Sequence, residues 1–263
     1  MIVSKSSAEI AKIAAAGEVV AECLELLAAA VRPGVTTAEL DRRAEKFIVG
    51  RGGTPTFKGY RGFPKSICAS PNEMVVHGIP GAYTVRDGDV LSIDVGVTLD
   101  GYVADSALTL AVGKVDGEAL RLLSVTRESL EAAIEQCRVG RRLGDVSHAV
   151  QEVVEAAGFN VVRSLVGHGV GRVMHEEPQI PNYGDPGRGP RLEAGMVFAI
   201  EPMVNVGTFD VYLGDDAWSI YSADHSLSAH FEHTVAITAR GPRVLTRRRS
   251  ERVSEVRVAG VGR

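Results

Sequence analysis

The sequence has little of what marks a secreted or membrane-spanning protein. Only three of its 263 residues are cysteines, and their wide spacing does not suggest a disulfide framework. No apolar run approaches the roughly 18 residues that a membrane span requires. The charged residues Lys5, Glu9, Lys12 and Glu18 lie where a secretory signal has an unbroken apolar stretch. We therefore expect a soluble cytoplasmic protein with no membrane partner.

Motifs of several common enzyme classes are absent as well. The chain has no G-x-S-x-G nucleophile elbow, no P-loop, no H-E-x-x-H helix and no paired C-x-x-C. A formal net charge of −4 gives no indication that nucleic-acid binding is the main task. With 45% hydrophobic and 24% charged residues, the composition excludes a disordered chain. Function must therefore be read from particular residues.

A pattern of two helices followed by strands occurs twice. The predicted helices span residues 8–31, 36–49, 118–138 and 143–157. Ser6 and Glu9 are spaced as a capping box at the start of the first helix. The junctions Arg32-Pro33-Gly34 and Arg138-Val139-Gly140 occupy the same place in the two pairs. Chance similarity of two helix–helix turns is the alternative to an internal repeat.

Strand-like segments follow each helix pair. They span residues 66–69, 90–97, 102–112, 160–166, 196–200 and 229–238. Two such halves predict one mostly antiparallel sheet whose one face is covered by helices, an α+β fold, with a site on the other face between the halves. We expect one domain over residues 1–239, with halves of about 7–112 and 117–239, and a basic, solvated tail over 240–263.

Two aspartates fall on one face of a predicted hairpin. Alternation in residues 90–97 places Asp94 opposite to the apolar face, and Asp100-Gly101 is a two-residue turn signal. Pairing across that turn sets Asp94 opposite Ala107 and leaves Asp105 diagonal to it, about 7–8 Å away at the backbone. Two buried carboxylates repel unless a positive group lies between them, and a metal ion meets that need. An exposed hairpin face is the alternative for this pair alone.

Three more residues join this set. Glu201 ends an apolar strand before Pro202, Glu232 lies inside a strand-like segment, and His168 is flanked by Gly167 and Gly169, which permit close backbone approach. One histidine and four carboxylates suit divalent metals, and so many oxygen ligands suggest two ions. Each residue alone is more often structural, but together they predict a metal site.

Five segments carry a recognisable family pattern. They are NEMVVHGIP (72–80), SIDVGVTLDGYVADSA (92–107), GHGVGRVMHEEPQIPNY (167–183), FAIEPMVN (198–205) and SLSAHFEHT (226–234). In this order and spacing they resemble the methionine aminopeptidases, over about residues 7–239, and that family's "pita-bread" fold has pseudo-two-fold halves. The form looks like type I, because His175 and Glu201 lie too close in sequence for the helical insertion of type II enzymes. We also expect no N-terminal extension before the first helix.

The resemblance implies a dinuclear metal centre. Its ligands would be Asp94, Asp105, His168, Glu201 and Glu232. Asp94 would bind one ion, His168 and Glu201 the other, and the remaining two would bridge. Co, Mn, Fe and Zn all suit these ligands. The water between the ions would be activated for attack on the first peptide carbonyl.

The resemblance also implies catalytic and substrate-binding residues. Glu201 would move the proton of the water, His77 would contact substrate near the scissile amide, and His175 would stabilise the tetrahedral intermediate. The pocket for the methionine side chain would be lined by Tyr60, Phe63, Cys68, Met174 and Trp218. Because only 5% of the residues are aromatic, three aromatic side chains at one site would be a concentration. Ordinary core packing is the alternative for each of them.

Several positions depart from the commonest family sequence. Gly96 stands where many members have Thr, Val103-Ala104 replaces His-Gly, His230 replaces Gln, and Arg61 replaces a His found in some members. None is an expected ligand, yet side chains beside the ligands can alter metal affinity about 10–100-fold. A secondary paralogue with a narrower role is one hypothesis.

The resemblance predicts removal of the initiator methionine from nascent proteins and from peptides with a small second residue. A proline-specific aminopeptidase of the same fold, or a non-catalytic binding protein on this fold, are the alternatives. The substrate would be a peptide or nascent-protein N-terminus. We expect a monomer, and the basic tail raises the hypothesis of a transient ribosome contact.

Overall fold

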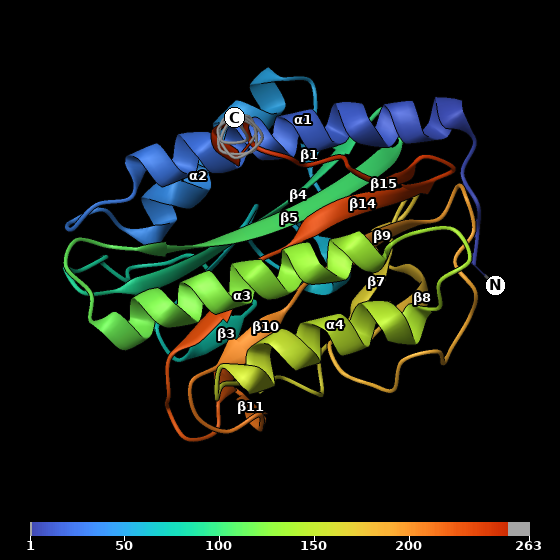
Figure 1. The fold of residues 1–263 in the computed structure, drawn as a ribbon. Coiled ribbons are helices and arrows are strands. Elements are labelled where there is room, and N and C mark those ends of the chain that lie inside the picture. Colours follow the sequence, from blue (N-terminus) through green and yellow to red (C-terminus); the bar gives the residue numbers. More distant parts are fainter. Residues whose placement is uncertain (1, 252–263) are drawn as a thin grey trace, which may run out of the picture.

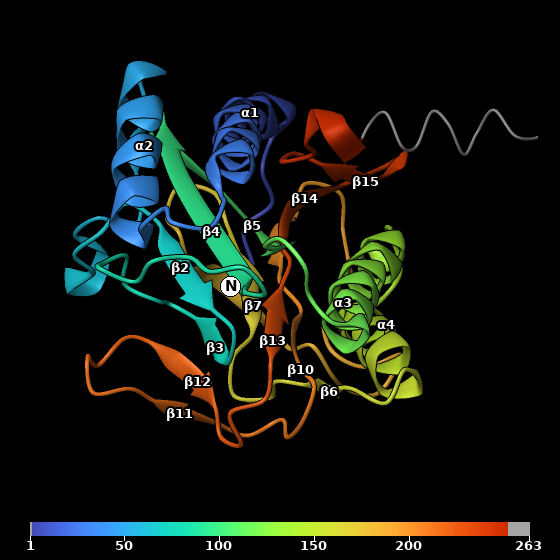
Figure 2. The same ribbon diagram turned by 90° about the vertical axis from the view of Figure 1, so that its left-hand side faces the viewer.

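Four helices form the outer layer of the fold. The computed structural model describes residues 2–251. The helices are α1 (Ser7–Ala30), α2 (Thr37–Gly50), α3 (Gly117–Gln136) and α4 (Leu143–Ala156), in agreement with the four predicted from sequence. Figure 2 shows α1 and α2 at the upper left and α3 and α4 at the right. No helix in residues 2–251 combines the length and apolarity needed to span a membrane.

Local capping explains where these helices begin. The Ser6 side chain accepts a hydrogen bond from the Glu9 amide, and the Glu9 carboxylate accepts one from the Ser6 amide, which completes the predicted capping box. The side chains of Thr36 and Asp116 cap α2 and α3 by accepting a hydrogen bond from the amides of Glu39 and Ala119. The helix pairs thus begin where the sequence alone predicts.

The first-half strands form a four-stranded antiparallel sheet. It contains β1 (Thr54–Pro55), β2 (Cys68–Pro71), β4 (Val90–Leu99) and β5 (Tyr102–Ala111). Helix α1 packs on β4 and β5 and α2 on β1, which buries the apolar face of the sheet (Figure 1). A 3₁₀ turn, η1 (Tyr60–Gly62), lies between β1 and β2.

The second-half strands form three further sheets, one of which also contains β3 of the first half. One contains β7 (Gly167–Gly169), β8 (Glu176–Ile180), β9 (Val197–Ile200), β14 (His233–Thr238) and β15 (Gly241–Val244). Another contains β6 (Asn160–Val161), β10 (Met203–Asn205) and β13 (Ser228–His230), and the last contains β3 (Met74–Val76), β11 (Val211–Leu213) and β12 (Ile220–Ser222). All pairings are antiparallel, so the α+β class is confirmed, although hydrogen bonding divides the expected single sheet into four.

The division between the sheet of β9 and β14 and the sheet of β10 and β13 has a local cause. Ile200 pairs with His233 and Met203 with His230, so the same register continues from the β9–β14 ladder to the β10–β13 ladder. Between these pairs the ladder is interrupted at Pro202, which has no amide hydrogen to donate. The predicted strand over 229–238 is therefore broken at residues 231 and 232.

Two other expectations need correction. The predicted strand over 160–166 is confined to β6, because residues 164–166 turn to line a cavity.

The segment 241–248, expected to be part of a solvated tail, is folded onto the rest of the protein. There β15 pairs with β14, Leu245 and Thr246 are buried, and Arg247 forms an ion pair with Glu131. Arg249 pairs with Glu22 of α1, and sequence spacing reveals neither of these two pairs with distant helices. Residues 252–263 of the expected tail lie outside the described residues.

Candidate metal centre

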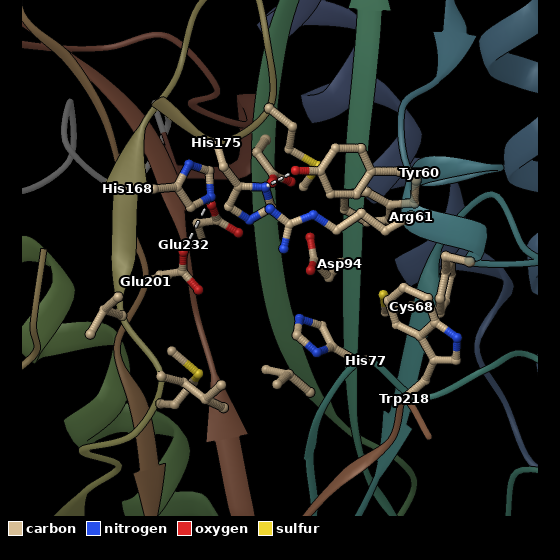
Figure 3. A pocket seen from close by; sticks show the side chains of 18 of the residues that line it. Tyr60, Arg61, Cys68, His77, Asp94, His168, His175, Glu201, Trp218 and Glu232 are labelled. Carbon is tan, nitrogen blue, oxygen red and sulfur yellow. Dashed lines mark hydrogen bonds and ion pairs between the residues drawn. The ribbon is translucent and has the colours of Figure 1, made fainter. Parts of the chain in front are cut away.

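One cavity of about 270 Å³ lies at the meeting of the two halves. Every residue that the sequence analysis assigned to metal binding, catalysis or the methionine pocket lines this cavity. They come from β2, β4, β5, β7 and the loops around them (Figure 3). Tertiary folding therefore brings together side chains that are up to 172 positions apart, Tyr60 and Glu232.

The two aspartates lie as their hairpin register predicts. Asp94 on β4 pairs with Ala107, and Asp105 on β5 pairs with Gly96, so the carboxylates are diagonal on one face. The turn between the strands has positive φ at Asp100 and Gly101, which suits the Asp-Gly signal. Burial raises the pKa of Asp94 to about 7. Burial, followed by the charges of Glu232 and Asp94, raises the pKa of Asp105 well above its usual range.

The two glutamates occupy the break in the second-half ladder. Because the register continues across that break, Glu201 faces Glu232 from the neighbouring strand. The Glu232 amide donates to the carbonyl of Ala107 in the first half, and the Ser106 hydroxyl donates to the carbonyl of Glu232. These bonds replace the lost ladder contacts and set Glu232 beside β5. Burial, followed by the charges of other carboxylates in the cavity, raises the pKa of Glu201 and of Glu232.

His168 completes the cluster from β7. Its Nδ1 lies 2.9 Å from the carbonyl oxygen of Gly169, so Nδ1 carries the proton that donates and Nε2 is left with a free lone pair. That Nε2 lies 3.4 Å from Glu201 Oε1. The flanking glycines are required, because a Cβ at Gly167 would lie 2.5 Å from the carbonyl oxygen of Ala199. Burial also lowers the pKa of His168 to about 4, which keeps the ring neutral at neutral pH.

These side chains fit a divalent metal site. Candidate ligand atoms of Asp105, His168 and Glu232 lie within 4.8 Å of one another. One oxygen each of Asp94, Asp105 and Glu232 is buried without a hydrogen-bond partner in the described part of the chain. Several carboxylates that raise one another's pKa, together with a neutral imidazole, form a donor set that a cation would stabilise.

Two further histidines point into the cavity from opposite sides (Figure 3). The His175 ring stacks on Tyr60 with centroids 5.4 Å apart, and the Tyr60 hydroxyl lies 2.8 Å from its Nδ1. His77 has the left-handed backbone angle φ 61°, a strained conformation for a non-glycine residue that turns its side chain from the end of β3 into the cavity. Burial lowers the pKa of His77 to about 4.

The other end of the cavity is apolar and aromatic. Phe63 packs edge-on against Trp218 at a centroid distance of 5.1 Å, and Cys68 and Met174 line the same space. Further residues that the sequence did not predict also line the cavity, namely Phe57, Val76, Ser164, Leu165, Val166 and Met203. Val76 and Met203 lie inside the family motifs over 72–80 and 198–205, and this position could have predicted them. The others come from irregular loops, whose direction the sequence does not indicate. Arg61, noted only as a departure, also lines the cavity.

Comparison with known proteins places the chain in a family. Residues 11–239 match metallopeptidase family M24. A methionine aminopeptidase from Clostridium perfringens is 53% identical over 246 residues, which cover 94% of this chain and 99% of that protein. A solved structure of methionine aminopeptidase from Thermotoga maritima has a TM-score of 0.93 at 46% identity and covers 94% of this chain and 100% of that one. A prolidase from Pyrococcus furiosus shares the fold alone, with a TM-score of 0.75 and 22% identity over 93% of this chain and 65% of that one. The chain therefore belongs to metallopeptidase family M24, in its methionine aminopeptidase branch.

Proposed function

We propose that this chain is a metal-dependent aminopeptidase that removes methionine from the N-terminus of peptides and nascent proteins with a small second residue. One observation carries the proposal. A single cavity joins a buried carboxylate cluster at one end to an aromatic, apolar pocket at the other. An apolar pocket beside a metal-type donor set suits a substrate with an apolar side chain next to the bond that is hydrolysed.

We propose that Asp94, Asp105, His168, Glu201 and Glu232 hold two divalent ions of Co, Mn, Fe or Zn. When bound, such ions supply a polarised carbonyl and a water of lowered pKa. The free α-amine of a substrate would bind at this centre. Binding of the amine there favours cleavage at an N-terminus rather than within a chain.

The remaining roles fall to side chains around this cluster. Glu201 is the proton acceptor for the attacking water and returns that proton to the leaving amine. His175 and His77 face the cavity, where His175 stabilises the charge that develops on the tetrahedral intermediate and His77 contacts the substrate near the scissile amide. The Tyr60 hydroxyl fixes the orientation of the His175 ring through Nδ1. Phe63, Cys68, Met174 and Trp218 receive the methionine side chain.

The setting of the enzyme is also part of the proposal. We propose one catalytic domain built from both halves, acting as a monomer in the cytoplasm, with a transient ribosome contact through its basic C-terminal end. The prolidase likeness extends to the fold alone, whereas the likeness to methionine aminopeptidases covers nearly the whole of both chains. A non-catalytic binding protein would not need the five ligand-type side chains that line the cavity.

The test is methionine release from a Met-Ala-Ser peptide. Protein stripped of metal receives Co, Mn, Fe or Zn in turn, with Met-Pro and Ala-Pro peptides in parallel. We expect metal-dependent release from Met-Ala-Ser, with kcat reduced about 10²–10⁴-fold in Glu201→Gln because the proton acceptor is lost.

The matched control is Glu193→Gln, an exposed glutamate outside the cavity, which should behave as the wild type. Cleavage of Ala-Pro but not Met-Ala-Ser would assign the chain to the proline-specific reaction. Binding of peptide without cleavage by any metal form would instead support a binding protein.

A further inference from the structure

His230 is a buried histidine with an unpaired ring nitrogen. It ends β13, two residues before Glu232, and only 2% of its surface is exposed. Within residues 2–251, its Nε2 has no hydrogen-bond partner. The side chain does not line the cavity, so it lies behind the carboxylates rather than among the groups that face a substrate. A buried polar atom without a partner is unfavourable and requires an explanation.

The unpaired nitrogen points at the carboxylate cluster. His230 Nε2 lies 3.9 Å from Glu201 Oε2 and 4.0 Å from Glu232 Oε2. Both distances exceed the 2.7–3.2 Å of an N–H···O hydrogen bond, so neither contact is yet formed. A small rotation of either glutamate side chain would close the gap.

The backbone of His230 is fixed where the two halves meet. Its amide donates to the Thr109 hydroxyl at 2.9 Å, and that hydroxyl donates to the His230 carbonyl oxygen at 2.7 Å. Thr109 belongs to β5, the strand that carries Asp105. The main chain of His230 is therefore held in place relative to the cluster.

Glu201 is the better partner of the two glutamates. The main chain of Glu232 is already tied to β5 through its amide and its carbonyl. Glu201 has His168 Nε2 at its Oε1 and His230 Nε2 at its Oε2, so the two imidazoles flank its carboxylate. A hydrogen bond on the Oε2 side would fix the plane of a carboxylate whose other oxygen faces the ligand cluster.

We propose that His230 is a positioning residue that donates from Nε2 to Glu201 Oε2 and so orients Glu201 when the centre binds metal. The inference rests on the proposed metal centre. Carboxylates that bind metals are themselves held by hydrogen bonds, and removing such partners weakens metal affinity. Glutamine also carries an N–H donor and could replace the imidazole in this role. A donor at this position, rather than an imidazole as such, is the required feature.

The test compares two substitutions by titration calorimetry of the metal-free full chain with Mn²⁺. His230→Leu removes the donor at similar volume and should weaken Mn²⁺ binding about 10–100-fold, whereas His230→Gln keeps a donor and should stay close to the wild type. His148→Leu is the matched control, because His148 lies on α4 outside the cavity. It should leave the affinity unchanged.

Each outcome decides the matter. Unchanged affinity in His230→Leu, or an equal loss in His230→Gln, would overturn the role of His230 and leave the proposed function intact. Failure of the wild type to bind any of Mn²⁺, Co²⁺, Fe²⁺ and Zn²⁺ would overturn both. If His230→Leu does not fold, a crystal structure of the metal-loaded wild type decides. It should place His230 Nε2 within about 3.2 Å of Glu201, and a separation that remains near the present one would contradict the proposal.

Discussion

Gly96 lies on β4, the strand that carries Asp94, and its lack of a side chain affects how the neighbouring residues pack. It pairs with Asp105 in the β4–β5 ladder, directly beside the proposed ligands. A Cβ at this position would lie 2.6 Å from Cε1 of Phe57, closer than such atoms approach in proteins. The absence of a side chain at Gly96 therefore lets the Phe57 ring pack against the strand, where many relatives carry threonine.

At this scale we predict that Gly96→Thr, the commoner family residue, destabilises the protein. The added side chain must displace the Phe57 ring, and overpacking of this kind costs about 1–3 kcal/mol in the free energy of unfolding. Urea unfolding of the metal-free protein measures this change.

The control is the same substitution combined with Phe57→Ala, which removes the obstructing ring. The two changes should couple, so that the Gly96→Thr substitution costs less when residue 57 is small. Equal costs in both backgrounds would show that Phe57 is not the cause.

At the scale of elements, the segment that follows β15 packs closely against α1. Gly17 of α1 faces the chain just after β15, and a Cβ there would lie 2.4 Å from the carbonyl oxygen of Leu245. The Leu245 and Thr246 side chains are buried, and the Thr246 hydroxyl accepts a hydrogen bond from the Thr234 amide in β14. This close approach explains why the segment is part of the fold despite its many arginines.

We predict that Gly17→Ala destabilises the protein although alanine favours helices. The gain in helix propensity is about 1 kcal/mol, whereas separating α1 from a fixed backbone oxygen costs about 1–3 kcal/mol. Thermal unfolding of the metal-free protein should therefore show a lower Tm.

Gly117→Ala is the matched control, since it also lies in a helix and a Cβ there meets nothing within 4 Å. That variant should unfold at the wild-type temperature or above it. A Gly17→Ala protein as stable as Gly117→Ala would contradict the tight packing of α1 on the C-terminal segment.

At the scale of the whole molecule, the cavity is where the halves depend on each other. Asp94 and Asp105 come from the first half, and His168, Glu201 and Glu232 come from the second. Backbone and hydroxyl hydrogen bonds between β5 and the residues around β14 hold the two sets together. Burial and mutual repulsion raise the pKa of these carboxylates, so the folded state is less stable without a cation between them.

We predict that divalent metal raises the Tm of the protein and that chelation with EDTA reverses the effect. An ion at 100 times its dissociation constant adds about 2.7 kcal/mol, which corresponds to roughly 5–10 °C for a chain of this size. Scanning calorimetry with and without Mn²⁺ measures the shift.

Glu232→Gln should lose most of this shift, because it removes one of the proposed ligands, while Glu193→Gln should keep it. Equal shifts in both variants would mean that the ion stabilises the chain somewhere other than this cavity.

The sequence by itself determined the local features. Helix starts follow from caps such as Ser6 with Glu9, and the diagonal placement of Asp94 and Asp105 follows from strand alternation and an Asp-Gly turn. These features depend on residues a few positions apart, so short segments of the sequence are enough to predict them. Residue types and their places on predicted strands added the candidate ligand set, whose members line one cavity.

Only the tertiary structure decided how distant segments meet. Local patterns do not relate the residues that meet where His230 approaches Glu201, where Phe57 packs on Gly96 and where the arginine-rich segment folds onto α1. The break between β13 and β14 at Glu232 could not be predicted from the sequence either, because the Glu232 amide donates to β5 of the other half instead of to the neighbouring strand of its own sheet. Such contacts arise from the joint packing of both halves around one core, and no short segment of the sequence contains that information.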